Sequence, residues 1–364
     1  MKIGVIYADL RGKRNHRFPN LCCMKISGFH KNRGDEVRLI TDVNDLQDVQ
    51  KVYIAKVFTS IPDPFENMTV SNAVPIIRGG TGYFFEKAEP LPYQMEHTMP
   101  DYHLYDKWAE GKSGTRYYSD YSIGYLTRGC FRKCKFCVNQ KYSRAFEASQ
   151  LEEFYDPARK KICLLDDNFL SHPKWKAMLE KVIFTGKPYQ FKQGLDERIL
   201  NEEMAEMIFN SKYDGEKIFA FDNLRDYPVI ARKLEMIRKY TDEVVKFYVL
   251  CGFESTDIRD IEGVFKRIEL LFSQGAIPYI MRYRSASDEP WKQSEFEWLY
   301  TTLARWCNQV RFCKKMTLKE FIQANQDLCK TDKWCKSYSG MKNFSEKYPL
   351  LYNKYFNMRF RRWV

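Results

Sequence analysis

The chain has 364 residues and a mass of 43.5 kDa, which is enough for two or three compact domains. Its contents of 44% apolar and 29% charged residues are those of a globular protein and exclude general disorder. The net charge of +12 favours anionic partners such as nucleic acid, nucleotides or other phosphate-bearing molecules, and no apolar run is long enough for a membrane span.

The chain begins with a short apolar strand and a basic loop, without the longer apolar run and small-residue cleavage site of a secretory signal. We therefore expect a cytoplasmic protein with no membrane association. Its 11 cysteines are odd in number, which together with the missing signal argues against a disulfide framework. Metal ligation and ordinary buried thiols are the two remaining interpretations.

Residues 1–90 predict an α/β domain of Rossmann-like type with a parallel sheet. Apolar, β-branched runs alternate with polar segments, and residues 20–34 have the pattern of a helix that ends at Gly34. Strand–helix–strand alternation implies that the strands are parallel. The predicted strands are residues 2–8, 36–41, 51–58 and 74–80.

The rest of the chain predicts a linker, a barrel and a helical extension. Residues 91–120 are rich in Pro and Tyr and lack periodicity, which predicts a linker packed on the surface. Residues 121–285 alternate strands and helices, as in a partial (β/α)6 barrel. Residues 286–364 predict a strongly basic helical extension. The six predicted barrel strands are residues 121–127, 161–167, 188–194, 217–222, 246–253 and 277–284.

The motif that indicates chemistry is the segment TRGCFRKCKFCVNQ, directly after the first barrel strand. Cys130, Cys134 and Cys137 stand at CxxxCxxC spacing, and thiolates are the usual ligands of iron–sulfur clusters. Three cysteines on one tight loop can bind three irons of a [4Fe–4S] cube and leave the fourth iron open. A structural zinc site needs four closed ligands, and no fourth Cys or His lies nearby, since His103 is 27 residues upstream. Three incidental thiols are the remaining alternative.

This loop resembles the radical S-adenosylmethionine (SAM) superfamily, whose signature is CxxxCxΦC with an aromatic Φ, here Phe136. The resemblance covers residues 121–285. It implies that the open iron binds SAM, that one electron cleaves SAM to a 5′-deoxyadenosyl radical, and that this radical abstracts a substrate hydrogen. It also implies a reductant such as flavodoxin or ferredoxin as a partner. The substrate stays open, with nucleic acid, a nucleotide or another phosphate-bearing molecule favoured by the charge.

The small α/β domain before the cysteine loop resembles the cobalamin-binding branch of the same superfamily. That branch carries a DxHxxG motif whose His ligates cobalt, and this sequence has no such motif around His16 or His30. Cobalamin is therefore not expected. A cobalamin-type methyltransferase, and a non-catalytic zinc-containing protein that binds nucleic acid, are the two alternative functions.

Polar residues after the next strands are the candidates for SAM contacts, because parallel barrels place their chemistry at the carboxyl ends of the strands. The resemblance implies that the second strand end holds the SAM amino group and that later ends meet its carboxylate and ribose. Helix capping by the same side chains is the alternative. The candidates are Asp166, Asp167 and Asn168 after the second strand, Gln193 and Arg198 after the third, Asp222 after the fourth and Glu254 after the fifth.

Two features of the C-terminal extension have alternative interpretations. Four cysteines, Cys307, Cys313, Cys329 and Cys335, invite a second iron–sulfur or zinc site, but their spacing does not suit a metal knuckle, so this site is not expected. The last residues mix basic and aromatic side chains, including Arg359, Arg361, Arg362 and Trp363. They suit either stacking on bases and phosphate binding or packing against the barrel.

Overall fold

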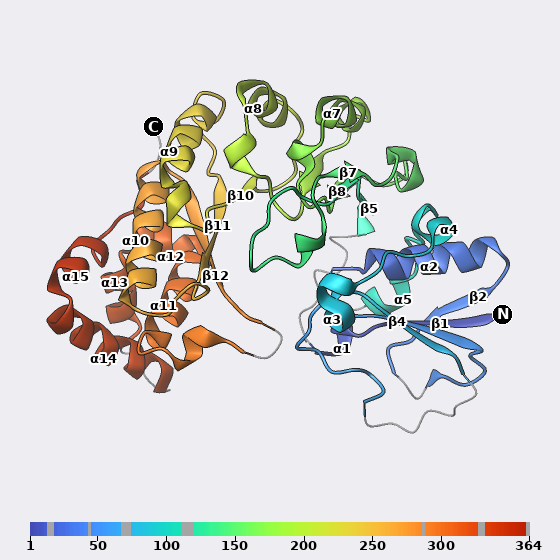
Figure 1. Cartoon of the computed structure of the whole chain (residues 1–364), viewed down its shortest axis with the longest axis horizontal. Helices are drawn as coiled ribbons and strands as arrows, with labels where there is room; N and C mark the ends of the chain where they lie inside the picture. Colours follow the sequence, from blue (N-terminus) through green and yellow to red (C-terminus); the bar gives the residue numbers. More distant parts are fainter. Residues whose placement is uncertain are drawn as a thin grey trace. The chain divides into compact units, whose positions relative to one another are not determined.

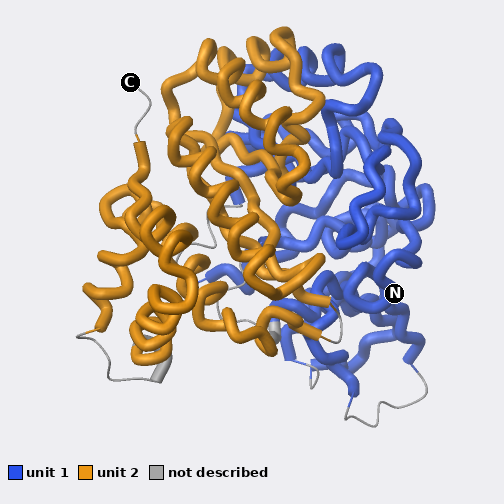
Figure 2. The backbone as a smooth tube through the Cα atoms, turned by 60° about the vertical axis from the view of Figure 1, so that its left-hand side comes forward, with its two compact units in different colours: residues 1–193 blue, residues 194–364 orange. Residues whose placement is uncertain are grey.

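The computed structural model describes residues 1–12, 18–42, 45–66, 74–110, 119–285, 288–326 and 332–361. The chain forms two compact units, residues 1–193 and residues 194–364 (Figure 2). The boundary between them falls inside the segment 121–285 for which a barrel is predicted. Each unit has its own parallel sheets and helices, so the expected α/β class with parallel sheets is present.

The first unit begins with a four-stranded parallel sheet in the order β2-β1-β3-β4 (Figure 1). Its strands are β1 (Lys2–Tyr7), β2 (Glu36–Leu39), β3 (Lys51–Ala55) and β4 (Ile76–Gly79). The helix α2 (Leu21–Asn32) follows β1, and its first turn is capped by the Asn20 side chain, which accepts from the Cys23 N–H at 3.0 Å. The short helices α1 (Asp9–Gly12) and α3 (Thr81–Phe84) follow strand ends.

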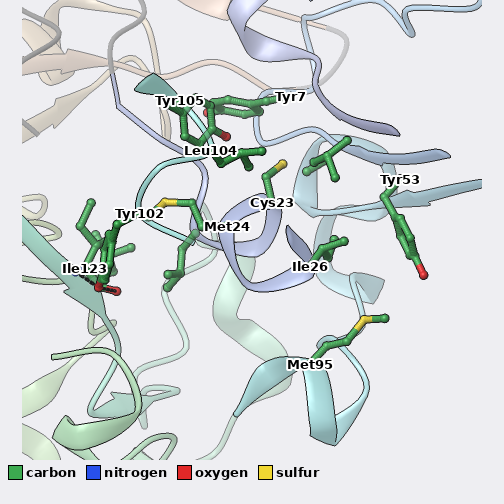
Figure 3. Packing of buried hydrophobic residues seen from close by; sticks show 14 of the residues in the cluster. Tyr7, Cys23, Met24, Ile26, Tyr53, Met95, Tyr102, Leu104, Tyr105 and Ile123 are labelled. Atoms are coloured by element: carbon green, nitrogen blue, oxygen red, sulfur yellow. Dashed lines mark hydrogen bonds between the residues drawn. The ribbon is translucent and has the colours of Figure 1, made fainter. Parts of the chain in front are cut away.

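The stretch after this sheet inserts several of its side chains into the core. It contains α4 (Tyr93–Glu96) and α5 (Asp106–Ala109), and four of its side chains belong to the buried cluster of the first sheet (Figure 3). These are Met95, Tyr102, Leu104 and Tyr105, each at most 9% exposed. The Tyr102 hydroxyl accepts from the Ile123 N–H at 2.8 Å and donates to the Phe154 carbonyl at 2.6 Å. These side chains anchor the stretch in the core, while others such as Tyr93, which is 76% exposed, lie on the surface as predicted for a linker.

The first unit also contains a three-stranded parallel sheet in the order β5-β8-β9. Its strands are β5 (Tyr121–Gly124), β8 (Lys161–Leu164) and β9 (Tyr189–Phe191), with α7 (Trp175–Phe184) between the last two. A short antiparallel pair, β6 (Thr127–Arg128) and β7 (Phe146–Glu147), closes the base of the cysteine loop.

The second unit contains a parallel sheet in the order β10-β11-β12. Its strands are β10 (Ile218–Ala220), β11 (Lys246–Cys251) and β12 (Ile277–Arg282), and its first helices are α8 (Glu202–Phe209), α9 (Tyr227–Ile237) and α10 (Ile258–Ser273). All six predicted barrel strands are present. The described strands pair as two three-stranded sheets, one in each unit, so closure into a single six-stranded barrel stays a prediction.

The C-terminal extension is helical, as expected. Its helices are α11 (Glu297–Cys307), α12 (Val310–Lys315), α13 (Leu318–Ala324), α14 (Asp332–Lys347) and α15 (Pro349–Tyr355). Aromatic contacts attach it to α10, because Phe265 stacks on Tyr355 at 5.0 Å and Phe272 meets the edge of Trp306 at 5.4 Å. Among the described residues, no helix combines the length and the apolar character needed to cross a membrane.

Candidate functional site

The cysteine loop leaves β6 through a backbone position that needs glycine. Gly129 has φ of 86°, and a Cβ there would lie 2.5 Å from the Arg144 carbonyl oxygen. The loop then turns tightly, because the Cys137 N–H donates to the Cys134 carbonyl at 2.9 Å. Cys130, Cys134 and Cys137 are all half-buried. The loop therefore has a defined backbone and keeps its three thiols partly accessible.

Nitrogen donors contact the sulfur atoms of Cys130 and Cys137. The Cys130 Sγ accepts from the Arg132 N–H at 3.3 Å and from the Asn168 amide at 3.2 Å. The Cys137 Sγ accepts from the Asn139 N–H at 3.4 Å. Donors of this kind stabilise thiolates, and in iron–sulfur sites they tune the reduction potential. The donor set therefore fits cysteines that act as metal ligands.

The three thiols also influence one another electrostatically. Burial raises the pKa of Cys137; the Asn139 N–H opposes this effect, while Cys134, Asp167 and Cys130 add to it. Three thiolates beside a carboxylate form a locally negative group, and bound irons would supply the compensating positive charge. Phe136, the aromatic residue of the motif, is half-buried on the same loop.

The end of β8 holds the cysteine loop in place. Asp167 accepts from the Gly129 N–H through Oδ2 and from the Asn139 side-chain amide through Oδ1, both at 2.8 Å. Gly129 precedes the first cysteine and Asn139 follows the last, so one carboxylate fixes both ends of the loop. The structure thus brings Asp167 and Asn168 together with the cysteines, but with a loop-holding geometry that the sequence did not predict.

Asp166 lies deeper in the first unit. Its Oδ1 accepts from the Thr127 N–H at 2.6 Å and from the Thr127 hydroxyl at 2.7 Å, and its Oδ2 accepts from the Leu126 N–H at 3.3 Å. Burial raises the pKa of Asp166 to about 7, although these donors oppose the shift. Asp166 therefore joins the ends of β5 and β8. Gln193, the last candidate of this unit, is exposed.

In the second unit, the Arg198 guanidinium already has acidic partners. Its Nε lies 2.8 Å from Asp196 Oδ1, and its Nη1 lies 3.1 Å from Asp226 Oδ2. The neighbouring Glu197 is fully buried, accepts from the Ala220 N–H at 3.0 Å, and has a pKa raised to about 8, chiefly by burial. Arg198 thus serves an internal ion-pair network here, and its predicted contact with a SAM carboxylate stays a prediction.

Asp222 and Glu254 follow β10 and β11 in the same unit. Asp222 accepts weakly from the Leu250 N–H at 3.3 Å, and burial raises its pKa to about 6. Glu254 is exposed and accepts from the Asn223 amide at 3.2 Å. Both carboxylates belong to the carboxyl-end rim of this sheet, as predicted for strand-end residues. Their contact with SAM stays a prediction.

Sequence reasoning missed a buried arginine beneath this rim. Arg267 of α10 donates through Nη1 to the carbonyls of Phe221, Asp222 and Leu250 at 2.8 to 3.0 Å. It is 3% exposed and therefore fixes the ends of β10 and β11. The signal was available, because position 267 lies on the apolar face of α10 with Val264, Ile268 and Leu271.

The C-terminal cysteines do not gather at one point in the described part of the chain. Cys307 and Cys313 are buried, and the Cys313 thiol donates to the Val310 and Cys307 carbonyls at 3.5 and 3.7 Å. Cys335 is exposed on α14, and Cys329 lies outside the described residues.

Within the described residues, no three His, Cys, Asp or Glu side chains are arranged to hold a metal ion. Ligands of one zinc ion must converge on a point, whereas ligands of a cube each bind a different iron. The cluster on the cysteine loop stays a proposal.

Comparison with known proteins identifies the fold. No protein-family model matches the chain, and no curated protein matches it. A solved structure does match: the radical S-adenosylmethionine methyltransferase TsrM from Kitasatospora setae, with cobalamin and a [4Fe-4S] cluster bound. The match has a TM-score of 0.51 and 12% sequence identity, and it covers 77% of this chain and 74% of that one. The chain shares its fold with this structure over about three quarters of each chain. At this identity the likeness carries the fold alone.

Proposed function

We propose that the chain is a radical SAM enzyme with a [4Fe–4S] cluster on Cys130, Cys134 and Cys137. The observation that carries this proposal is the cysteine loop itself, with its CxxxCxxC spacing and its attachment to the end of β8 by Asp167 and Asn168. The shared fold with TsrM supports it. The substrate class that the basic composition favours is a nucleic acid, a nucleotide or another phosphate-bearing molecule.

The residues of this chain would bind and orient the reacting groups. Each of the three cysteines would bind one iron, and the remaining iron would be open to SAM. When bound, the cluster supplies the electron that cleaves SAM and so yields a radical able to abstract a substrate hydrogen. Asn168 donates to the Cys130 sulfur and so influences the potential of the site. Asp167 keeps the loop ends in place while the cysteines hold the irons.

The test combines metal content with product analysis. Anaerobic reconstitution should give about four irons and four sulfides per chain, and reduction with SAM should release 5′-deoxyadenosine. The triple variant Cys130→Ala, Cys134→Ala, Cys137→Ala should lose both properties. The matched control Cys335→Ala, at an exposed thiol, should keep both. Release of 5′-deoxyadenosine by the triple variant, or one zinc and no iron in the parent protein, would contradict the proposal.

A cobalamin-dependent methyltransferase is the second candidate, because TsrM is a methyltransferase with cobalamin bound and the match extends over most of both chains. His30 does not suit a cobalt ligand, since its Nδ1 lies 2.7 Å from Asp35 and its Nε2 lies 3.1 Å from the Tyr53 hydroxyl. His16 lies outside the described residues. Titration with hydroxocobalamin, followed by its absorption spectrum, tests this candidate. A stoichiometric complex that withstands gel filtration would support it.

A further inference from the structure

The net charge of the chain is concentrated near its C-terminus. Residues 301–364 contain 14 Lys and Arg against 4 Asp and Glu, a net charge of +10. Residues 1–300 contain 45 basic and 43 acidic residues, a net charge of +2. The basic character of the protein is therefore a local property of the helical extension, and a local surplus of this size creates a directed electrostatic potential.

Part of this charge forms one surface, which we call the basic face. On α12, three basic residues recur at helical spacing on the side opposite the buried Cys313. The chain near the C-terminus lies against α12 and α13, because the Lys319 N–H donates to the Phe356 carbonyl at 3.0 Å and the Lys314 Nζ lies 5.6 Å from the centre of the Phe360 ring. The basic face consists of Arg311, Lys314, Lys315, Lys319, Arg359 and Arg361.

Few acids neutralise the basic face. Within the described residues, Arg359 forms an ion pair with Glu320, and the other five side chains of the face have none. Elsewhere in the same unit exposed cations do have acidic partners, for example Lys239 with Glu202 and Lys292 with Glu289. Five of the six residues are exposed and Lys319 is half-buried. The face therefore presents unneutralised positive charge to a ligand.

Aromatic rings lie between these charges. The Arg311 guanidinium lies 4.6 Å from the centre of the half-buried Phe312 ring, and Lys314 lies over Phe360. Basic side chains alternating with rings suit a strand of phosphates and unstacked bases. An interfacial helix would need several exposed apolar side chains, and in the described part of the extension Leu350 is the one large hydrophobic residue that is strongly exposed. The chemistry therefore favours nucleic acid over a lipid surface.

We propose that the basic face binds the backbone of a single-stranded nucleic acid. The proposal does not depend on the proposed function, because none of its residues lies near the cysteine loop in the sequence and a chain without a cluster keeps the same face. According to this proposal, the helical extension binds a polymeric ligand through its phosphates. Such binding is independent of base sequence and weakens with salt.

The test uses the full chain and fluorescence anisotropy of labelled 20-nucleotide single strands of RNA and of DNA, at several salt concentrations. The double variant Lys314→Glu, Lys315→Glu should weaken binding about tenfold or more and should reduce the salt slope by about 1.4, since each lost phosphate contact removes ~0.7. The matched control is Lys174→Glu, Lys181→Glu, which makes the same change in net charge at two exposed lysines, one at the N-cap of α7 and one within it. It should stay within about twofold of the parent chain.

The same variants decide between the possible outcomes once circular dichroism has shown that they are folded. Equal weakening by both double variants would show that binding follows net charge alone and would overturn the proposal. So would an absence of binding at 50 mM salt, or tighter binding to phosphatidylserine vesicles or polyglutamate than to either single strand. Stronger binding of RNA than of DNA, or the reverse, supports the proposal and identifies the source of the strand. The triple cysteine variant should bind as the parent does, so failure of the proposed enzyme activity would leave this result intact.

Discussion

The two oxygens of Asp167 hold opposite ends of the cysteine loop, which makes this side chain a positioning residue. In Asp167→Asn the amide keeps one acceptor oxygen, so either the Gly129 N–H or the Asn139 amide must lose its acceptor. We expect iron retention after reconstitution and gel filtration to fall, with a loss of about tenfold or more in affinity, as for other groups that orient metal ligands. Iron titration in the presence of a chelator measures this.

The control for this variant is Asp156→Asn, whose carboxylate accepts from the Ala158 N–H at 2.9 Å away from the loop. It should retain iron as the parent does. If Asp167→Asn also retains iron normally while its thermal unfolding is unchanged, the loop does not need the carboxylate, and the positioning role is refuted.

Glu197 gives the second unit a pH-dependent stability. Burial chiefly raises the pKa of this carboxyl from 4.5 to about 8, and the adjacent Asp196 contributes. Between pH 4.5 and 8 the folded chain therefore keeps a proton that the unfolded chain releases. The bound proton stabilises the folded chain, and this stabilisation decreases as pH rises through that range and is lost above about pH 8. For one proton the slope is at most about 1.4 kcal/mol per pH unit. Glu197→Gln, which has no such proton, should flatten the fall in unfolding free energy between pH 6 and 8.

Urea unfolding at pH 6, 7 and 8 measures this slope. Asp166 and Asp222, with pKa values of about 7 and 6, contribute to the fall in both chains. The difference between parent and variant therefore isolates Glu197. The exposed Glu243 provides the control, because Glu243→Gln should leave the slope as it is. An unchanged slope in Glu197→Gln would show that the buried carboxyl is already ionised in the fold.

The residues of the candidate site differ in how far the sequence could predict them. Cys130, Cys134 and Cys137 are defined by local spacing, so a short motif suffices. Asp167 and Asn168 position the cysteine loop through hydrogen bonds to residues about 30 to 40 positions away in the chain. No local sequence pattern encodes such contacts. The ion pair of Arg198 with Asp226, 28 positions away, depends on the fold in the same way, and its contact with a SAM carboxylate stays a prediction.

At the scale of elements, the strands were predicted well, whereas the buried side chains of the stretch after the first sheet were not predicted. Each strand is a short apolar run between polar segments, so period and length are visible in the sequence. Residues 91–110 have no period, because their burial depends on isolated side chains such as Tyr102 that insert into a core built by other elements. Pairing between strands is also non-local, which is why the split into two three-stranded sheets was not foreseen.

A Tyr102 variant tests whether such an isolated buried side chain stabilises the fold. Its hydroxyl bonds to the backbone of β5 at Ile123 and to the Phe154 carbonyl, inside the first unit. Tyr102→Phe keeps the ring but leaves the Ile123 N–H and the Phe154 carbonyl without this partner, which should cost about 1–3 kcal/mol of unfolding free energy. Chemical denaturation measures the loss. Tyr93→Phe, at a tyrosine that is 76% exposed, should change stability little. Equal effects in the two variants would mean that the buried hydroxyl bonds do not stabilise the fold.

At the scale of the whole molecule, the fold does not determine the reaction. The likeness to TsrM spans about three quarters of each chain, and at 12% identity it carries the fold alone. The two reactions convert SAM into different products. Methyl transfer leaves S-adenosylhomocysteine, whereas reductive cleavage leaves methionine and 5′-deoxyadenosine. The products of one incubation therefore decide between the two proposed functions.

We expect the reconstituted chain, with SAM and a chemical reductant, to form 5′-deoxyadenosine and methionine in equal amounts, with or without added cobalamin. The reason is that the cysteine loop is complete in this sequence, whereas the cobalamin motif is absent. Liquid chromatography with mass detection measures all three products, and Cys130→Ala sets the background. If S-adenosylhomocysteine forms instead, and forms only when cobalamin is present, the chain is a methyltransferase and hydrogen abstraction is not its reaction.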